Sequence, residues 1–302
     1  MTRFGRVISP YAAHSRIFLN FLMANIFKKR KTGTHKGDYG HVLIVAGSIG
    51  LTGAAYLASD AALLTGSGLV TCAIPKSLNS IMETKLTEVM TFPLEDNGKG
   101  HFSLSAFHKI KEFSQKTDVV AIGPGISQKG EVGKLIKKLI KTLDVPIVLD
   151  ADGINCIADE PQILKKAKKA LVITPHPGEM SRVIRKEIGY IQKNRKSVAK
   201  NIAKKYGLTV VLKGKNTVVA SQHENVYVNK TGNPGMASAG VGDILTGIIA
   251  SLIGQGFSPF NAAECSVYIH GLAGDIAAKE KGEVSLRAQD VLNNISNAIK
   301  IG

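Results

Sequence analysis

The sequence of 302 residues contains no tryptophan and only three cysteines, which stand far apart at Cys72, Cys156 and Cys265. It has no Cys-x-x-Cys pair and no cluster of cysteine with histidine, so neither a zinc site nor a disulfide framework is predicted. We expect three reduced thiols that behave as small apolar residues in a cytoplasmic protein. The P-loop pattern Gly-x-x-x-x-Gly-Lys-Ser/Thr, the hydrolase pattern Gly-x-Ser-x-Gly and the zinc-protease pattern His-Glu-x-x-His are also absent.

Apolar runs long enough to cross a membrane are missing as well. The candidate nearest to one, Ile17–Phe27, has eleven residues and contains two asparagines, whereas a spanning helix needs about 20 apolar residues. Lys28-Lys29-Arg30-Lys31 follows it, where a signal peptide would have small residues for cleavage. We expect residues 1–30 to be an N-terminal extension that packs as a helix or frays, and we predict neither export nor a membrane anchor.

Acidic residues are scarce relative to basic ones, 23 against 39, which leaves a formal net charge of +16. Such a charge raises nucleic acid as a partner. The lysines are spread over helical patterns without interleaved aromatic residues, however, unlike the binding surfaces of single-strand binders. We interpret them as solvated helix faces and expect no nucleic acid partner. A basic nucleic-acid-binding or regulatory protein remains the alternative of a different class, and oligonucleotide binding that weakens steeply with salt would support it.

From residue 41 onward, short apolar runs alternate with helical patterns. The predicted strands are His41–Ala46, Leu69–Ile74, Asp118–Ile122, Pro146–Leu149, Leu171–Ile173 and Thr209–Leu212. The predicted helices between them are Gly53–Leu64, Ser103–Phe113, Gly130–Thr142 and Tyr190–Tyr206. Strands that are apolar on both faces and alternate with helices predict an α/β protein with a mostly parallel sheet covered on both sides.

The pattern changes after Leu212. Thr217–Ala220 and Asn225–Val228 predict a β-hairpin, and Gly240–Ile253, Pro259–Ala278 and Arg287–Ile299 predict three helices. Because no Pro/Ser-rich linker or repeat interrupts the chain, we expect a single domain over residues 31–302.

Two glycine-rich turns could bind phosphate. The first turn follows a strand and reads Gly47-Ser48-Ile49-Gly50-Leu51-Thr52-Gly53, without Gly-x-Gly-x-x-Gly spacing. The next strand ends in Pro75-Lys76, where a dinucleotide-binding Rossmann unit would have an acidic residue. Such a unit is therefore disfavoured. Ala239-Gly240-Val241-Gly242-Asp243 opens an apolar helical pattern. Amides at a helix start hold anions, and Asp243 would be close enough to accept a proton from an attacking hydroxyl. A tight turn with Asp243 as a favourable first-turn carboxylate is the alternative.

The segment Asn233–Gly247 resembles the signature of the ribokinase-like NAD(P)H-hydrate dehydratases. Further segments match in order: Lys36–His41, Gly53–Ala55, Gly66–Val70, Ile122–Gly125, Asp150–Asn155, Thr174–Glu179 and Val211–Gly214. The resemblance covers roughly residues 33–300. It implies a ribokinase-like three-layer α/β/α fold and a repair enzyme that uses ADP or ATP, with Mg²⁺, to dehydrate hydrated NADH or NADPH.

The resemblance also implies roles for individual residues. Asp243 would be the catalytic base, beside an anion hole made by Ala239, Gly240, Val241 and Gly242. Contacts to the hydrated dinucleotide would come from Ala54, Gly123, Gly125, His176 and Asp243. Contacts to the adenine nucleotide would come from Lys213, Gly214, Lys215, Asn216, Thr217 and Gly242. An ordinary surface lysine at a turn is the alternative for Lys213.

The metal ligands stay open. Asp150, Asp152 and Asn155 follow a buried strand and could organise water around Mg²⁺, although Asp152 could equally cap a helix. Glu179 could help to place the metal or simply start a helix.

The close functional alternative is a ribokinase-like kinase for hydroxymethylpyrimidine or hydroxyethylthiazole. We expect a homo-oligomer, with a tetramer as one candidate. Members of this family are often fused to an N-terminal epimerase domain. Because only about thirty residues precede the matching region here, we do not predict epimerase activity for this chain.

Overall fold

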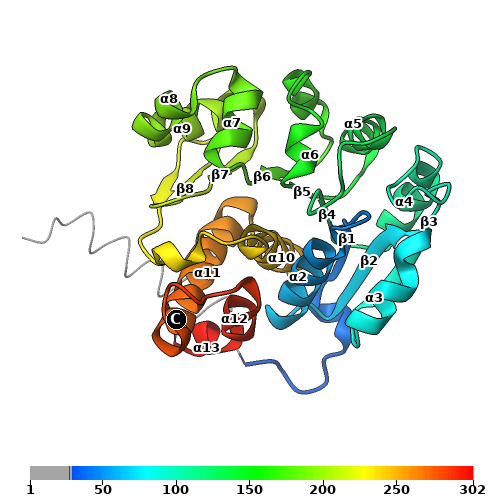
Figure 1. Ribbon diagram of the computed structural model, residues 1–302, viewed down its shortest axis with the longest axis horizontal. Helices are drawn as coiled ribbons and strands as arrows, with labels where there is room; N and C mark the ends of the chain where they lie inside the picture. Colours follow the sequence, from blue (N-terminus) through cyan, green and yellow to red (C-terminus); the bar gives the residue numbers. More distant parts are fainter. Residues whose placement is uncertain (1–26, 28, 302) are drawn as a thin grey trace, which may run out of the picture.

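The computed structural model describes residue 27 and residues 29–301, which form a nine-stranded sheet in the order β3-β2-β1-β4-β5-β6-β7-β8-β9 (Figure 1). Strands β1 to β7 pair in parallel, and β8 and β9 continue the sheet as an antiparallel hairpin. The strands are β1 His41–Val45, β2 Leu69–Pro75, β3 Met90–Leu94, β4 Val119–Ile122, β5 Ile147–Leu149, β6 Leu171–Ile173, β7 Thr209–Leu212, β8 Val218–Ala220 and β9 Val226–Val228.

Helices cover both faces of the sheet, so the molecule has three layers (Figure 1). The α-helices are α2 Thr52–Leu64, α3 Asn79–Lys85, α4 Ala106–Ser114, α5 Val132–Thr142, α6 Asp152–Asn155, α7 Pro177–Ile184, α8 Ile188–Lys193, α9 Arg195–Tyr206, α10 Val241–Gly254, α11 Pro259–Lys281, α12 Ala288–Asn293 and α13 Ile295–Ile301. Short 3₁₀ helices are η1 Lys36–Tyr39, η2 Lys76–Leu78, η3 Pro161–Lys166 and η4 Pro234–Met236.

Two hydrophobic cores lie on opposite faces of the sheet because successive strand residues point to opposite sides. In β1, Val42 and Ile44 pack against α2, α10 and α11, whereas Leu43 and Val45 pack with α4 and α5. The central parallel strands are therefore buried on both faces, as predicted for parallel strands. This arrangement confirms the expected α/β/α architecture.

Helices α2 and α10 pack closely at Gly247. A Cβ atom on Gly247 would overlap the carbonyl oxygen of Ala58 in α2, so only glycine allows this approach. Most of α10 is buried, including Ile244, Leu245 and Ile248. The close packing places the start of α10 at the carboxyl edge of the sheet, where ligands bind in open α/β folds.

The predicted strands and the hairpin are confirmed to within a residue at each end, but two helix predictions were wrong. The predicted helix Tyr190–Tyr206 is split into α8 and α9 by Asn194, which has φ −122° and ψ 28°. Likewise, Asn294 separates α12 from α13 within Arg287–Ile299. Both helical patterns continue across the break, so periodicity alone could not show it. Strand β3 was missed because it is an edge strand with only partial burial.

The apolar stretch Ile17–Phe27 lies outside the described residues apart from Phe27, whose side chain packs against the core on the α2 side. Within residues 29–301, the structure contains no helix that is both long enough and apolar enough to cross a membrane.

Candidate active site

The start of α10 offers unpaired amides. Its N-cap residue, Gly240, has φ +89°, and a Cβ atom there would lie 2.5 Å from Cδ1 of Leu57. The N–H of Asp243 donates to the carbonyl of Gly240 over 3.1 Å, whereas the N–H groups of Val241 and Gly242 have no acceptor among the described residues. These two amides are therefore available to an anion, and the helix dipole adds positive potential at the same place.

Asp243 lies in the first turn of α10 and is partly buried. Its carboxylate accepts no hydrogen bond from the described part of the chain. Burial, together with the negative charges of Asp150 and Glu179, raises its pKa to about 7, although the nearby ammonium of Lys213 acts in the opposite direction. A carboxylate with this pKa and no competing donor is suited to accept a proton near neutral pH.

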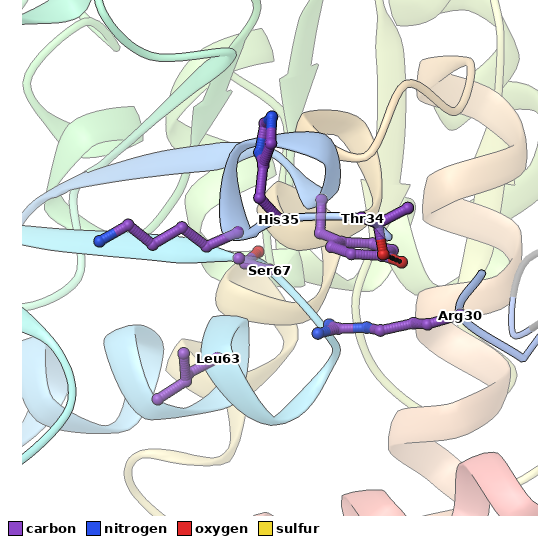
Figure 2. Close-up of a pocket in the computed structure, with 8 residues that line it drawn as sticks. Arg30, Thr34, His35, Leu63 and Ser67 are labelled. Atoms are coloured by element: carbon purple, nitrogen blue, oxygen red, sulfur yellow. Dashed lines mark hydrogen bonds between the residues drawn. The ribbon is translucent and has the colours of Figure 1, made fainter. Parts of the chain in front are cut away.

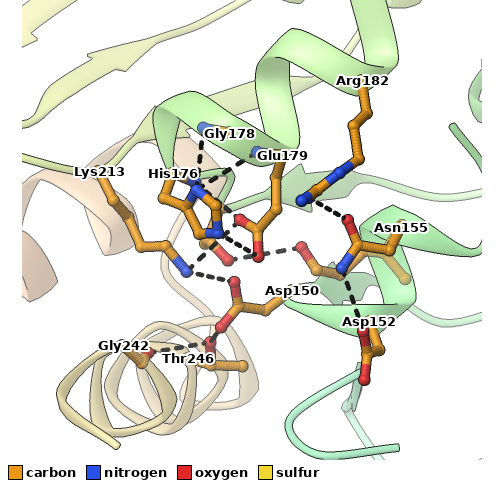
Figure 3. Close-up of polar contacts among 12 residues, drawn as sticks. Asp150, Asp152, Asn155, His176, Gly178, Glu179, Arg182, Lys213, Gly242 and Thr246 are labelled. Carbon is orange, nitrogen blue, oxygen red and sulfur yellow. Dashed lines mark hydrogen bonds and ion pairs between the residues drawn. The ribbon is translucent and has the colours of Figure 1, made fainter. Parts of the chain in front are cut away.

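Lys213 follows β7, and its side chain extends toward Gly242 at the start of α10 (Figure 3). Its Nζ atom lies 2.6 Å from Oδ1 of Asp150, at the end of β5, and 3.9 Å from Oε2 of Glu179 in α7. A Cβ atom on Gly242 would lie 3.3 Å from the same Nζ atom. The other oxygen of Asp150, Oδ2, accepts a hydrogen bond of 2.6 Å from the hydroxyl of Thr246. The interpretation of Lys213 as an ordinary surface lysine is therefore wrong.

The ion pair is deeply placed. Asp150 is 1% exposed, and burial alone would lower the pKa of Lys213, but Asp150 and Glu179 outweigh that effect and raise it. A buried carboxylate is tolerated only when it is paired and hydrogen-bonded, and Lys213 and Thr246 supply both conditions for Asp150.

His176 caps α7 in a way that determines its tautomer. Its Nδ1 atom accepts from the backbone N–H of Gly178 (2.9 Å) and of Glu179 (3.3 Å), so the neutral ring carries its proton on Nε2. Nε2 lies 3.3 Å from Oε1 of Glu179, and Oε2 of Glu179 accepts from the backbone N–H of His176. Burial, with the charges of Lys213 and Arg182, lowers the pKa of His176. The ring is half-exposed and lines the cavity described below.

Glu179 does start a helix, as one of its two sequence interpretations predicts, because it completes the capping box of α7. The residue is 4% exposed, and burial raises the pKa of its carboxyl group to about 7. Asp152 does not cap α6: the N-cap is Ala151, and Oδ1 of Asp152 accepts from the side chains of Gln128 and Asn155. That alternative for Asp152 was therefore wrong.

Ala54, Gly123 and Gly125 lie together behind the ion pair. A Cβ atom on Gly125 would lie 2.9 Å from Cβ of Ala54, and one on Gly123 would overlap the carbonyl oxygen of Asp150. Gly123 also has φ +131°, a conformation that favours glycine. These contacts bring the predicted dinucleotide-binding glycines to the same edge of the sheet as Asp150 and Lys213.

A cavity of about 910 Å³ opens beside the start of α10. Its wall contains His176, the whole loop 213–217, Val241 and Gly242. The structure thus brings together the predicted nucleotide loop and two residues of the predicted anion hole, although these segments are about 25 residues apart in the chain. A volume of this size is within the range of small-molecule sites.

A second cavity, of about 440 Å³, lies at the opposite edge of the sheet, between η1 and the segment before β2 (Figure 2). Its wall includes Arg30, Tyr39 and Ser67, and none of the site residues predicted from the sequence. The larger cavity is therefore the candidate active site; it contains the predicted nucleotide loop, whereas Asp243, Ala54, Gly123 and Gly125 are not among its lining residues.

Two contributors were missed in the sequence. Thr246 is a polar residue about one helical turn after Asp243 in a largely apolar helix, a signal that could have indicated its contact with Asp150. His270 in α11 lines the larger cavity, and its Nε2 atom lies 2.8 Å from the carbonyl oxygen of Val241. Burial lowers the pKa of His270 to about 4, so the ring is neutral and donates this hydrogen bond.

Comparisons with known proteins agree on one family. The family model for NAD(P)H-hydrate dehydratase matches residues 42–297. A bifunctional NAD(P)H-hydrate repair enzyme from Moorella thermoacetica is 45% identical over 265 residues, which are 88% of this chain and 50% of that protein. An ADP-dependent (S)-NAD(P)H-hydrate dehydratase from Neisseria meningitidis is 35% identical over 85% of this chain and 84% of its own length. The chain spans about half the length of the bifunctional relatives.

Among solved structures, the ADP/ATP-dependent NAD(P)H-hydrate dehydratase of Bacillus subtilis, co-crystallised with ATP and Mg²⁺, superimposes with a TM-score of 0.77. The two chains are 27% identical, and the match covers 94% of this chain and 96% of the other. The ribokinase of Thermotoga maritima, at 12% identity and a TM-score of 0.55, shares the fold alone. The fold is therefore ribokinase-like.

Proposed function

Because this chain belongs to the NAD(P)H-hydrate dehydratase family, we propose that it uses ADP or ATP to dehydrate hydrated NADH or NADPH to the normal reduced cofactor. One observation carries the proposal: the carboxylate of Asp243, free of hydrogen-bond donors from the described residues, lies beside the unpaired amides of Val241 and Gly242. A base and an anion hole at one helix start are what phosphorylation of an alcohol requires.

In the proposed reaction, the hydroxyl group of the hydrate attacks the terminal phosphoryl group of the nucleotide and gives its proton to Asp243, while the bond from that phosphorus to the bridging oxygen breaks and AMP or ADP leaves. The amides of Val241 and Gly242 stabilise the negative charge on the transferring group. Phosphorylation converts hydroxide, a poor leaving group, into phosphate. The lone pair of the ring nitrogen then expels phosphate, and the neighbouring carbon gives a proton to the departing phosphate or to water, which restores the double bond.

Lys213 supports this chemistry from the side of β7. Its ammonium group lies next to Gly242, so it adds positive charge where the phosphoryl group would sit, while Asp150 and Thr246 keep it in place. His176 lines the cavity with a neutral ring whose Nδ1 accepts from the backbone of α7 and whose Nε2 lies next to Oε1 of Glu179, so it offers the substrate a contact surface and does not act there as a base.

Magnesium, when bound with the nucleotide, would neutralise phosphate charge during transfer. Within residues 29–301 no three acidic, histidine or cysteine side chains are grouped for direct coordination. All four carboxylate oxygens of Asp150 and Glu179 already have partners. These residues therefore fit an ion held mainly by nucleotide phosphates and by water, which Mg²⁺ tends to retain. Asp150, Asp152 and Glu179 would hold it through water.

The test is an assay with hydrated NADH, ADP or ATP, and Mg²⁺, followed by the recovery of absorbance of the reduced nicotinamide. We expect the wild type and Asp144→Asn, an exposed carboxylate paired with Lys168, to restore it, and Asp243→Asn to be inactive. Product analysis separates the kinase alternative, because a kinase would accumulate a stable phosphate ester without recovery of absorbance. Turnover by Asp243→Asn at the wild-type rate would contradict the assigned role.

A further inference from the structure

The proposed nucleotide loop is held at its beginning by contacts from outside the cavity. The N–H of Lys213 donates to the carbonyl of Pro175 over 2.8 Å. On the other side, Nη2 of Arg195 donates to the carbonyl of Leu212 (2.7 Å) and to that of Lys213 (3.1 Å). The backbone that leads from β7 into the loop is therefore clamped between the segment before α7 and the start of α9.

Gly214 fits against this arginine. It has φ +128°, and a Cβ atom there would lie 3.2 Å from Nη1 and 3.4 Å from Nη2 of Arg195. The guanidinium group thus lies against the backbone at the point where the loop turns toward the cavity. The hydroxyl of Thr217 donates to the carbonyl of Gly214 over 2.9 Å. This hydrogen bond ties the end of the loop to the glycine that packs against Arg195.

Arg195 is partly buried and has no carboxylate partner in the described part of the chain. Its remaining described partner is Oε1 of Gln192, at 3.1 Å from Nη1, and its Nε atom has none. Burial alone lowers its pKa. An incompletely satisfied buried cation is costly, and an apolar side chain would pack at this helix start without that cost.

Arg195 does not line the cavity, so it would act on a ligand through the loop. We propose that Arg195 is a positioning residue that holds the loop 213–217 in its nucleotide-binding conformation and adds positive potential behind it. One nitrogen, Nη2, donates both to the carbonyl of Leu212, at the end of β7, and to that of Lys213, while Nη1 bonds to Gln192. The planar guanidinium group also packs against Gly214, and a lysine ammonium group cannot make all of these contacts at once. The inference rests on the proposed function, because it takes the ligand of this loop to be an adenine nucleotide.

The main test is Arg195→Met, which keeps an unbranched apolar stem but removes the carbonyl hydrogen bonds and the charge. ADP binding is measured by calorimetry on the full chain, and KM is measured for ADP and for hydrated NADH. We expect the Kd and the KM for ADP to rise about tenfold, while the KM for the hydrate stays within about twofold. The matched control is Lys196→Met, which removes the same charge from the exposed neighbouring residue and should bind ADP as the wild type does.

Arg195→Lys keeps the charge and should recover only part of the ADP affinity, since the shorter side chain can donate to the carbonyls but cannot also bond to Gln192 and pack flat against Gly214. Wild-type ADP affinity in folded Arg195→Met, or equal losses for ADP and the hydrate, would overturn the proposal. If Arg195→Met does not fold, Arg195→Lys decides: wild-type ADP affinity and KM in that variant overturn it. A wild type that binds ADP without turning over the hydrate would refute the proposed function instead, and ADP binding would still test Arg195.

Discussion

Replacing Asp243 by asparagine removes a charge and a base while changing the shape of the side chain very little. The base is lost outright, and general base catalysis typically contributes about 10²–10⁴-fold, so we expect turnover to fall by at least that factor. Nucleotide binding should remain, because the amides of Val241 and Gly242 are unchanged. The same change should make the folded protein more stable.

The magnitude follows from the environment of the carboxylate. Burial, with the charges of Asp150 and Glu179, raises the pKa of Asp243 from its usual 3.8 to about 7. Each tenfold change in acid dissociation corresponds to about 1.4 kcal/mol, so holding the ionised form in this site costs on the order of 4 kcal/mol at most. Partial solvent access reduces this cost, and we expect Asp243→Asn to gain about 1–4 kcal/mol at pH 8. For a domain of this size, that corresponds to roughly 2–8 °C in Tm.

The dependence on pH has a definite sign. Between pH 3.8 and about 7, the folded state retains a proton on Asp243 that the unfolded state has released, so the stability of the wild type falls as pH rises through this range. The advantage of Asp243→Asn should therefore be greatest above pH 7 and shrink as the pH approaches 4. In the wild type, kcat/KM should rise with pH through about 7, as the base becomes deprotonated.

Melting curves at several pH values, with Asp144→Asn as the control, test the reasoning. Asp144 is exposed, and its only described ion pair is with Lys168, so its replacement should change Tm little at any pH. A Tm for Asp243→Asn equal to or below that of the wild type at pH 8 would show that the carboxylate is not destabilising in the folded state. An advantage that does not depend on pH would exclude its ionisation as the cause.

Three further changes test the packing around the site. Lys213→Met leaves Asp150 buried without its cation, so the free energy of unfolding should fall by about 3–5 kcal/mol in urea denaturation; an unchanged value would mean that water already screens this pair. Thr246→Val removes the hydrogen bond to the same carboxylate at nearly constant volume and should cost about 1–3 kcal/mol, visible as a lower urea midpoint with an unchanged slope. Gly123→Ala would force a Cβ atom into the carbonyl of Asp150 and should lower Tm sharply, whereas Gly53→Ala, with open space in the first turn of α2, should leave Tm unchanged or raise it.

Part of the candidate site could be predicted from the sequence because its residues are neighbours in the chain. The glycine-rich start of α10 and the first-turn Asp243 are consecutive in the chain, so their shared position follows from helix geometry alone. The capping box of His176 and Glu179 is also local, because its partners are three residues apart. The cap interpretation of Asp152 failed because Ala151, with φ +49°, takes that position in a turn that residue type did not indicate.

By itself, the sequence determined the alternation of buried strands and helices, the hairpin at the end of the sheet and the glycine-rich start of α10, since each depends on residues near one another in the chain. Only the tertiary structure decided that Lys213 is the partner of Asp150, 63 residues away, and that Thr246 holds that carboxylate across 96 residues. A parallel sheet brings the carboxyl ends of its strands to one edge, whatever their distance in sequence. The raised pKa of Asp243 arises from that convergence, because burial and the neighbouring charges exist only once the edge has formed.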